Sequence, residues 1–334
     1  MVNVGVLGYG YWGPNLVRNL FTIKKASVKR LCDLSEKNLE RANGLYPSLE
    51  TTHDDKKVID SEDIDAVIIA TPISTHYSIV KRALEAGKHV FVEKPMTNDP
   101  EKARELIELA KEKSKVLMVG HTFLYNDAVR KVKEIIESGE IGKVLYVHTS
   151  RLNLGLFQPD SNVVWDLMPH DLSMILYFIG DIMPNKIIAS GYSHYNTGIE
   201  DTAQATLIFP NDVTANIRVS WLDPLKVRNV TVVGTKKMVV FDDTEPLEKV
   251  KIYDKGVEDT YNTFGEFQMA YRYGDIYVPK IRGIEALKIE MSHFLDCIEN
   301  NKVPLSDGEN GYKVVKLLND INNIIKEQNG NKLE

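Results

Sequence analysis

The first third of the chain alternates short apolar runs with segments whose apolar residues recur at helical spacing. Val2–Leu7 is an apolar run of strand length, and Leu16, Val17 and Leu20 follow it at the spacing of a helix. Further apolar runs at 28–32, 66–70, 88–92 and 116–119 are separated by segments with helix signals at 35–42, 74–86 and 99–113. Strands separated by helices of this length predict βαβ units and a parallel sheet.

Beyond residue 121 the pattern changes to an alternation of apolar and polar positions with a period of two. Ala215, Ile217 and Val219, for example, alternate with polar residues. Such alternation with short turns predicts an antiparallel sheet that packs one face on helices. Strands are expected at 143–149, 186–193, 202–209, 213–221, 229–233, 237–241 and 249–254, and helices at 128–138, 169–179, 284–299 and 310–326.

The two patterns divide the chain near residue 122. Residues 1–122 are expected to form an α/β domain, and residues 123–334 an α+β domain with an open, mainly antiparallel sheet. Because helices cover one face of that sheet, the other face must be solvated or paired, and we expect a homo-oligomer. Two apolar rows are expected to supply the surface: Ala203, Ala205, Leu207 and Phe209, and Ala215, Ile217, Val219 and Trp221.

Composition narrows the class of protein. The 334 residues are 43% hydrophobic and 26% charged with a net charge of −6, and the absence of a basic block argues against a nucleic-acid partner. Cys32 and Cys297 lie far apart without metal-ligand spacing, so both are predicted core residues and no metal site is expected. No signal peptide or membrane-length apolar run is recognised, so a cytoplasmic protein without membrane contact is expected.

Residues 8–13 read Gly-Tyr-Gly-Tyr-Trp-Gly, directly after the first predicted strand and before the first predicted helix. Gly8 permits a tight turn, Gly10 lets the backbone approach a pyrophosphate, and Gly13 lets the helix pack close to the strand. Asp33 lies twenty residues further on, where it would accept hydrogen bonds from ribose hydroxyls and repel a 2′-phosphate. The pattern predicts a Rossmann dinucleotide site with NAD as cofactor. A glycine turn that merely packs one βα unit would not require the acid.

The breaks after later strands open on the same edge of a parallel sheet, where ligands collect. Lys94 follows an apolar strand and precedes a proline, so it is held at this edge; the alternative is a surface lysine in a strand–loop corner. For His76, contact with the cofactor and capping of its helix both remain open. The predicted cofactor-binding residues are Gly8, Gly10, Tyr11, Trp12, Gly13, Asp33, Thr71, Pro72, His76, Glu93 and Lys94.

Asp166 and His170 form a second group with chemical potential. They are four residues apart and share one face if a helix has begun. Pro169 fits only a first turn, which predicts that the pair lies at a helix N-terminus. A helix dipole and a neighbouring carboxylate both tune a histidine for proton transfer. The alternative is an aspartate cap with a histidine packed behind it.

Several motifs in this order resemble the Gfo/Idh/MocA oxidoreductase family over nearly the whole chain. Glu93-Lys94-Pro95 matches the family's E-K-P, residues 70–76 its A-T-P-x-x-x-H, and Asp166 to His170 its D-x-x-x-H. The resemblance implies a Rossmann domain followed by an open α/β domain whose free sheet face forms a homodimer or homotetramer. It also implies that Lys94, Asp166 and His170 meet at the nicotinamide and are the catalytic residues.

The implied chemistry is oxidation of a sugar hydroxyl. His170 is the expected base because its pKa lies near working pH. Asp166 would orient that base or bind a hydroxyl, and Lys94 would stabilise developing oxyanion charge. The expected substrate contacts are Lys94, Arg151, Asp166, His170 and Arg272. The segment 264–277 is rich in aromatic residues, which would either stack on a uracil or pack on one another.

Segments 8–15, 220–224 and 274–280 resemble the branch of the family that oxidises UDP-N-acetylglucosamine to its 3-keto form. The resemblance implies amino-sugar biosynthesis with a downstream pyridoxal-phosphate aminotransferase. Three alternatives stay open: a dehydrogenase for inositol or another polyol, one for a nucleotide-linked uronic acid, and a non-catalytic dinucleotide-sensing regulator.

Overall fold

A computed structural model describes residues 1–155, 157, 161–195, 198–260 and 268–330. The chain forms two compact units. The first consists of Met1–Tyr125 and Ile284–Asn319, and the second of Asn126–Gly283 and Asp320–Glu334. The sequence pattern assigns residues 284–319 to the second domain, whereas in the structure this segment packs with the first.

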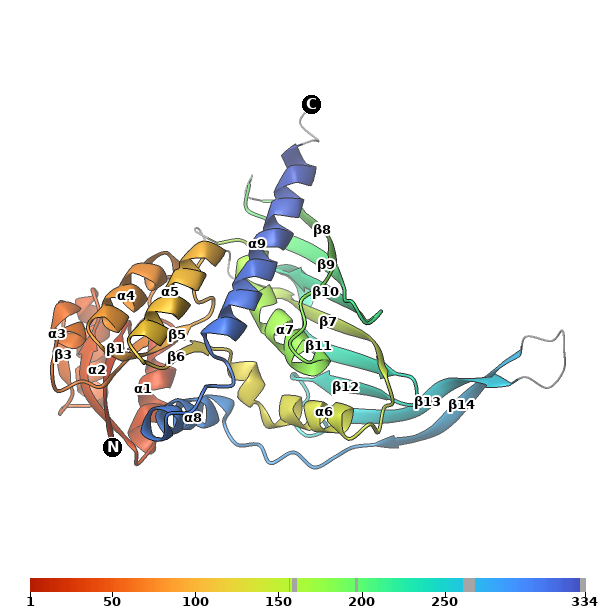
Figure 1. Ribbon diagram of the computed structural model, residues 1–334, viewed down its shortest axis with the longest axis horizontal. Coiled ribbons are helices and arrows are strands. Elements are labelled where there is room, and N and C mark those ends of the chain that lie inside the picture. The colour runs from red at the N-terminus through yellow and green to blue at the C-terminus, as the bar shows by residue number, and fades with distance from the viewer. Residues whose placement is uncertain (156, 158–160, 196–197, 261–267, 331–334) are drawn as a thin grey trace. The chain divides into compact units, whose positions relative to one another are not determined.

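The first unit contains a six-stranded parallel sheet in the order β3-β2-β1-β4-β5-β6, the Rossmann order (Figure 1). The α/β prediction is therefore confirmed. Its strands are β1 Val2–Leu7, β2 Ala26–Cys32, β3 Glu50–Thr52, β4 Ala66–Ile69, β5 His89–Glu93 and β6 Leu117–Gly120. Its helices are α1 Gly13–Thr22, α2 Glu36–Leu45, α3 Lys56–Ile59, α4 Ile73–Glu85, α5 Pro100–Glu112, the 3-10 helix η1 Thr122–Tyr125 and α8 Ala286–Asn300; α9 Gly308–Gly330 begins here and ends in the second unit.

Local sequence accounts for these elements. All four residues of β4 are buried, as expected of a central parallel strand. The Asp99 carboxylate caps α5 by accepting a hydrogen bond from the backbone N–H of Glu101 at 2.8 Å, and Pro100 occupies the first helical position. The pattern did not predict β3 and α3, because neither contains enough residues to show a period.

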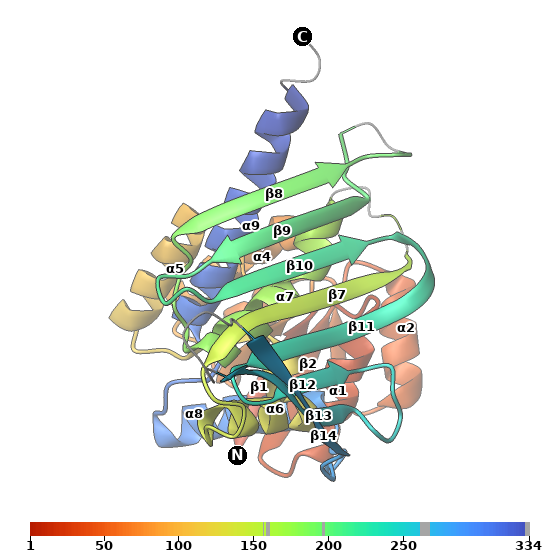
Figure 2. The same cartoon turned by 90° about the vertical axis from the view of Figure 1, so that its right-hand side faces the viewer.

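The second unit contains an eight-stranded sheet in the order β14-β13-β12-β11-β7-β10-β9-β8 (Figure 2). Neighbouring strands are antiparallel except for β7 and β10. The predicted mainly antiparallel sheet is confirmed. Its strands are β7 Val144–Leu154, β8 Lys186–Tyr192, β9 Thr202–Ile208, β10 Thr214–Ser220, β11 Leu222–Gly234, β12 Met238–Asp242, β13 Val250–Thr260 and β14 Gln268–Tyr277; its helices are α6 Asp127–Glu137 and α7 Val163–Ile179.

The helix start predicted at Pro169 is wrong. α7 begins at Val163, where the Asn162 side chain accepts a hydrogen bond from the backbone N–H of Trp165 at 3.2 Å, and Pro169 lies inside the helix. A proline there costs one backbone hydrogen bond, and helix breaking is the usual expectation. Burial of the mainly apolar α7 against β7, β9 and β10 offsets that cost.

The apolar rows predicted to form an oligomer surface lie inside the unit instead. Ala215 pairs with Leu207 and Ile217 with Ala205, so both rows share one face of the sheet. Their residues are at most 6% exposed, and α7 packs against this face. These rows are therefore core. That the chain forms a homo-oligomer stays a prediction, but these two rows would not form the interface.

β14 covers most of the aromatic segment predicted at 264–277, and residues 264–267 lie outside the described residues. Figure 1 shows β13 and β14 as a two-stranded extension of the sheet. Across the described part of the chain, no helix combines the length and the apolar character needed to cross a bilayer.

Candidate functional site

The glycine-rich loop after β1 has the geometry that its sequence predicts. Gly8 has φ +98°, and a Cβ built on it would lie 2.5 Å from the carbonyl oxygen of Ala70. A Cβ on Gly13 would lie 2.3 Å from the carbonyl oxygen of Gly8, so α1 packs directly on the turn. A Cβ on Gly10 would meet nothing within 4 Å, so the backbone there faces open space of the kind a pyrophosphate requires.

The Asp33 carboxylate lies beside this loop at the end of β2. It accepts hydrogen bonds from the backbone N–H of Tyr9 at 2.6 Å, the backbone N–H of Ser35 at 2.8 Å and the Asn38 side chain at 3.1 Å. No described side chain caps the N-terminus of α1, which leaves its positive dipole end for an anion. The loop therefore has the geometry of a dinucleotide site with the Asp33 carboxylate fixed beside it, and contact between Asp33 and a ribose stays a prediction.

Gly13 and Gly44 are a matched pair for testing the loop. We expect Gly13→Ala to lower the free energy of unfolding of the cofactor-free protein by about 1–3 kcal/mol, because the new methyl group collides with backbone. Gly44 lies in α2 with nothing within 4 Å, so Gly44→Ala should be neutral or stabilise by up to about 1 kcal/mol. Urea denaturation measures both. Equal effects at the two positions would show that α1 does not pack on Gly8 as described.

His76 connects two turns at the carboxyl edge of the parallel sheet. Its Nδ1 is 2.8 Å from the carbonyl oxygen of Pro95, and its Nε2 is 2.8 Å from that of Thr71. The side chain is 1% exposed, and burial lowers its pKa. His76 thus links the turns after β4 and β5 through its two ring nitrogens. Pro72 occupies the N-cap position of α4 without a side-chain capping bond, and the Thr71 hydroxyl accepts a hydrogen bond from the Thr75 hydroxyl. Cofactor contact by these residues stays a prediction.

Lys94 follows β5 directly and is half-buried. Burial raises the pKa of the neighbouring Glu93 carboxyl to about 7, and the charge of Lys94 opposes this rise. Burial, together with the charge of Lys94, lowers the pKa of His121 to about 3. The Lys94 ammonium therefore lies among ionisable groups at the carboxyl edge of the sheet and not in a solvated corner.

In the loop after β1, the side chains of Tyr11 and Trp12 reach solvent, at 92% and 37% exposed. Contact of these two residues with the cofactor stays a prediction.

Asp166 and His170 lie one turn apart on α7, as their spacing predicts, in the second unit. Asp166 is in the first turn of the helix, and its Oδ2 accepts a hydrogen bond from the Trp221 indole at 3.0 Å. The Trp221 ring in turn packs on Phe157, with centroids 5.4 Å apart. The sequence analysis placed Trp221 in an apolar strand row and in the segment 220–224 but gave its side chain no role at the site. The signal that was available is its indole N–H, which requires a partner when buried.

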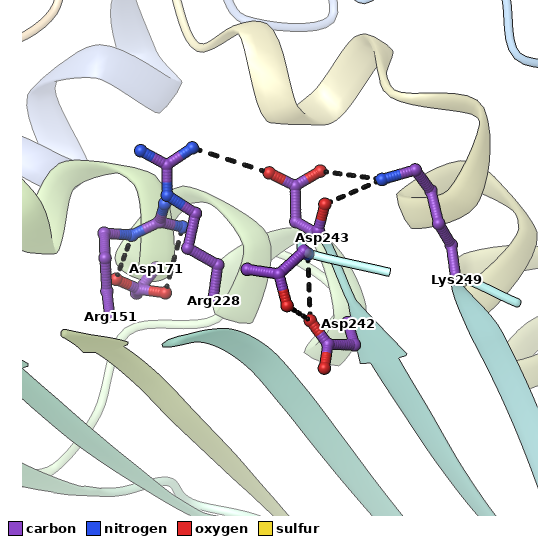
Figure 3. A network of polar contacts seen from close by, with 7 residues as sticks. Arg151, Asp171, Arg228, Asp242, Asp243 and Lys249 are labelled. Carbon is purple, nitrogen blue, oxygen red and sulfur yellow. Dashed lines mark hydrogen bonds and ion pairs between the residues drawn. The ribbon is translucent and has the colours of Figure 1, made fainter. Parts of the chain in front are cut away.

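Arg151, a predicted substrate contact, lies in a buried ion pair (Figure 3). Its Nε donates to the Asp171 carboxylate at 2.9 Å, and burial raises the pKa of Asp171. Because Asp171 follows His170, this pair anchors α7 to β7 immediately beside the candidate base. Figure 3 also shows Arg228 of β11 and Lys249, just before β13, paired with Asp243, just after β12.

Arg272, the other predicted substrate contact, lies on β14. Its Nε donates to the Asp254 carboxylate of β13 at 3.1 Å, and its guanidinium also bonds the carbonyl oxygen of Lys236. Substrate contacts by Arg151 and Arg272 stay predictions. Among the residues described, no group of three or more His, Cys, Asp or Glu side chains is arranged to hold a metal ion.

Comparison with known proteins agrees with this geometry. Residues 2–121 match the family model described as oxidoreductase family, NAD-binding Rossmann fold, and residues 129–240 match the GFO/IDH/MocA C-terminal domain. UDP-N-acetylglucosamine 3-dehydrogenase of Acidithiobacillus ferrooxidans is 28% identical over 94% of each chain. scyllo-Inositol 2-dehydrogenase (NAD(+)) of Bacillus subtilis is 25% identical over 91% of this chain and 87% of that protein.

The fold comparison points the same way. The solved structure of the A. ferrooxidans UDP-N-acetylglucosamine 3-dehydrogenase GnnA superposes with a TM-score of 0.82 at 23% identity, covering 98% of each chain. Both halves of the chain match models of one family, and named relatives of it oxidise sugars or polyols. The chain is therefore a dinucleotide-dependent sugar or polyol oxidoreductase that belongs to the Gfo/Idh/MocA family.

Proposed function

We propose that this enzyme uses NAD to oxidise the 3-hydroxyl of UDP-N-acetylglucosamine to the 3-keto sugar. The observation that carries the reaction class is the half-buried ammonium of Lys94 at the carboxyl edge of the Rossmann sheet, the edge to which the glycine loop also belongs. The choice of sugar is supported by the 28% identical relative of that name, which aligns over 94% of this chain.

The proposal gives each catalytic residue a role. A dinucleotide held by the glycine loop would supply the hydride acceptor for the sugar carbon. His170 removes the proton from the hydroxyl, and Asp166, which Trp221 holds by its indole N–H, orients His170 or the substrate. Lys94 donates a hydrogen bond to the same oxygen and stabilises the negative charge that develops on it. The Arg151–Asp171 pair holds the helix that carries the base.

Asp33 supports NAD in preference to NADP. Its carboxylate is fixed by three hydrogen-bond donors beside the glycine loop, where a 2′-phosphate would meet a negative charge. A 3-keto sugar nucleotide is reactive, so a second enzyme should consume it, and a pyridoxal-phosphate aminotransferase that forms a 3-amino sugar fits this chemistry.

A second candidate substrate is inositol, which is favoured by the 25% identical scyllo-inositol 2-dehydrogenase. The two proposals separate in one assay. NADH absorbance is followed with UDP-N-acetylglucosamine, inositol, glucose or UDP-glucuronic acid, and hydroxylamine is added to trap the ketone. We expect the highest kcat/KM with UDP-N-acetylglucosamine. A faster reaction with inositol or glucose would overturn the choice of sugar, and no turnover of any substrate would favour a regulator.

A further inference from the structure

The first unit contains a cluster of ionisable side chains, defined here as Glu93 at the end of β5, His121 after β6 and Glu290 on α8. Glu93 is half-buried as a residue, and its Oε1 is buried. Glu290 is 0% exposed and His121 is 1% exposed. Buried ionisable side chains normally have partners that offset the loss of water. This cluster therefore requires an explanation.

Neighbouring contacts bring the two carboxyls together. Phe91 and Glu93 share one face of β5, and Glu290 and Phe294 share one face of α8. The rings of Phe91 and Phe294 pack edge to face with centroids 5.9 Å apart, so β5 contacts α8 near both carboxyls. Both carboxyls also lie at the end of β6, since Glu93 pairs with Gly120 and Glu290 bonds Thr122. The electrostatic consequence agrees: burial raises the pKa of Glu290 well above its ordinary value, and the charge of Glu93 raises it further.

Each carboxyl has one oxygen in contact with the protein and one without a hydrogen bond. Glu290 Oε2 accepts a hydrogen bond from the Thr122 hydroxyl at 2.8 Å, and Glu93 Oε2 lies 3.3 Å from the backbone N–H of Lys94. Among the described residues, Glu93 Oε1, Glu290 Oε1 and both ring nitrogens of His121 have no hydrogen-bond partner. Two charged carboxylates would not be stable in this position, whereas a pair with one proton is.

The backbone fixes Glu93 in this position. Glu93 pairs with Gly120 in the parallel register of β5 and β6, and a Cβ on Gly120 would lie 2.9 Å from Glu93 Oε2. Glycine at 120 is what allows the carboxyl to lie across β6. The next residue, Lys94, has the charge that acts on both Glu93 and His121.

We propose that Glu93 and Glu290 hold one proton between them, and that Glu290 thereby acts through Glu93 as a positioning residue for Lys94. This inference rests on the proposed function for the role of Lys94. With the proton on Glu290, the pair carries one negative charge, which balances the ammonium. Protonated Glu290 donates a hydrogen bond to the Glu93 carboxylate and fixes its position. The fixed carboxylate in turn holds the Lys94 ammonium where the substrate hydroxyl binds.

Titratable groups approach the pair from each element packed against it. Lys94 follows β5, His121 follows β6, Tyr125 lies on η1, and His293 lies on α8 with its ring 5.5 Å from that of Tyr125. Burial raises the pKa of Tyr125 and lowers that of His121, so both are neutral near pH 7. The carboxyl pair therefore contributes to the charge balance around Lys94.

Infrared spectroscopy tests the shared proton without substrate. In the full-length protein labelled with [13C]glutamate, we expect a protonated carboxyl band at pH 8, where an ordinary glutamic acid with a pKa of about 4.3 is ionised. Glu290→Gln should remove the band, and Glu85→Gln, at an exposed position, should leave it unchanged. No band in the wild type, or a band that survives Glu290→Gln, would overturn the proposal.

Turnover tests the link to Lys94. Gln accepts the Thr122 hydrogen bond and donates to Glu93, as protonated Glu290 does, so Glu290→Gln should retain kcat within about threefold. Glu290→Met has similar size but no donor, so kcat should fall by about tenfold or more while the melting temperature is retained. Equal kcat in both variants would overturn the positioning role. If the wild type oxidises no sugar, the proposed function is wrong. The infrared band then still tests whether Glu93 and Glu290 share a proton, because that measurement needs no substrate.

Discussion

Replacing either Lys94 or His170 with alanine is expected to lower kcat by about a hundred- to ten-thousand-fold, the range of general acid–base contributions. In the proposed mechanism, Lys94 supplies the positive charge beside the developing oxyanion, and His170 supplies the base. Neither change removes an apolar core contact, because both side chains are only half-buried. The measurement is steady-state turnover with the substrate identified by the panel of sugars.

A loss of activity is informative only if the fold and the cofactor site remain. Thermal unfolding and NAD titration of each variant provide that check, and both should stay close to wild type. Lys102→Ala, which removes an exposed lysine from α5, is the matched control and should turn over normally. Near-normal kcat in Lys94→Ala or His170→Ala would remove that residue from the mechanism.

Asp33→Asn is expected to shift the ratio of NAD to NADP affinity by about tenfold or more toward NADP, because the amide removes the charge that repels a 2′-phosphate. The amide oxygen still accepts a hydrogen bond from the backbone N–H of Tyr9 or Ser35, so the loop stays in place. Titration of the protein with both dinucleotides, followed by fluorescence, measures the ratio.

Asp33→Ala separates charge from structure. It removes the charge and all three hydrogen bonds, so NAD binding should weaken more than in Asp33→Asn and the melting temperature should fall. A wild-type protein that binds NADP more tightly than NAD would show that Asp33 does not face the ribose.

The parallel half of the fold follows from the sequence because its signals are local. A buried strand, three glycines and an acid at fixed spacing predict one geometry, and Gly8 and Gly13 have it. The start of α7 could not be predicted from Pro169, because tertiary burial of an apolar helix outweighs the local cost of an internal proline. The prediction that two apolar rows form an oligomer interface was wrong for a related reason. Alternation shows that a strand has an apolar face but does not show what covers that face.

Side chains that act through others were the hardest to predict. Glu290 interrupts the apolar helical stripe of Leu287, Met291 and Phe294, a signal that marks a buried acid but does not name its partner. The partner, Glu93, is 197 positions earlier in the chain (290 − 93), and only the packing of β5 on α8 reveals it. Trp221 and Asp166 are likewise joined by a hydrogen bond between separate elements.

The central claim is that hydride leaves carbon 3 of the sugar of UDP-N-acetylglucosamine for NAD. The direct measurement uses UDP-N-acetylglucosamine deuterated at that carbon, with hydroxylamine present to trap the ketone, and mass spectrometry of the reduced cofactor. The account predicts one deuterium in each NADH formed and a trapped 3-keto product. Unlabelled NADH, or no reduction of NAD by this substrate while a polyol is oxidised, would contradict it.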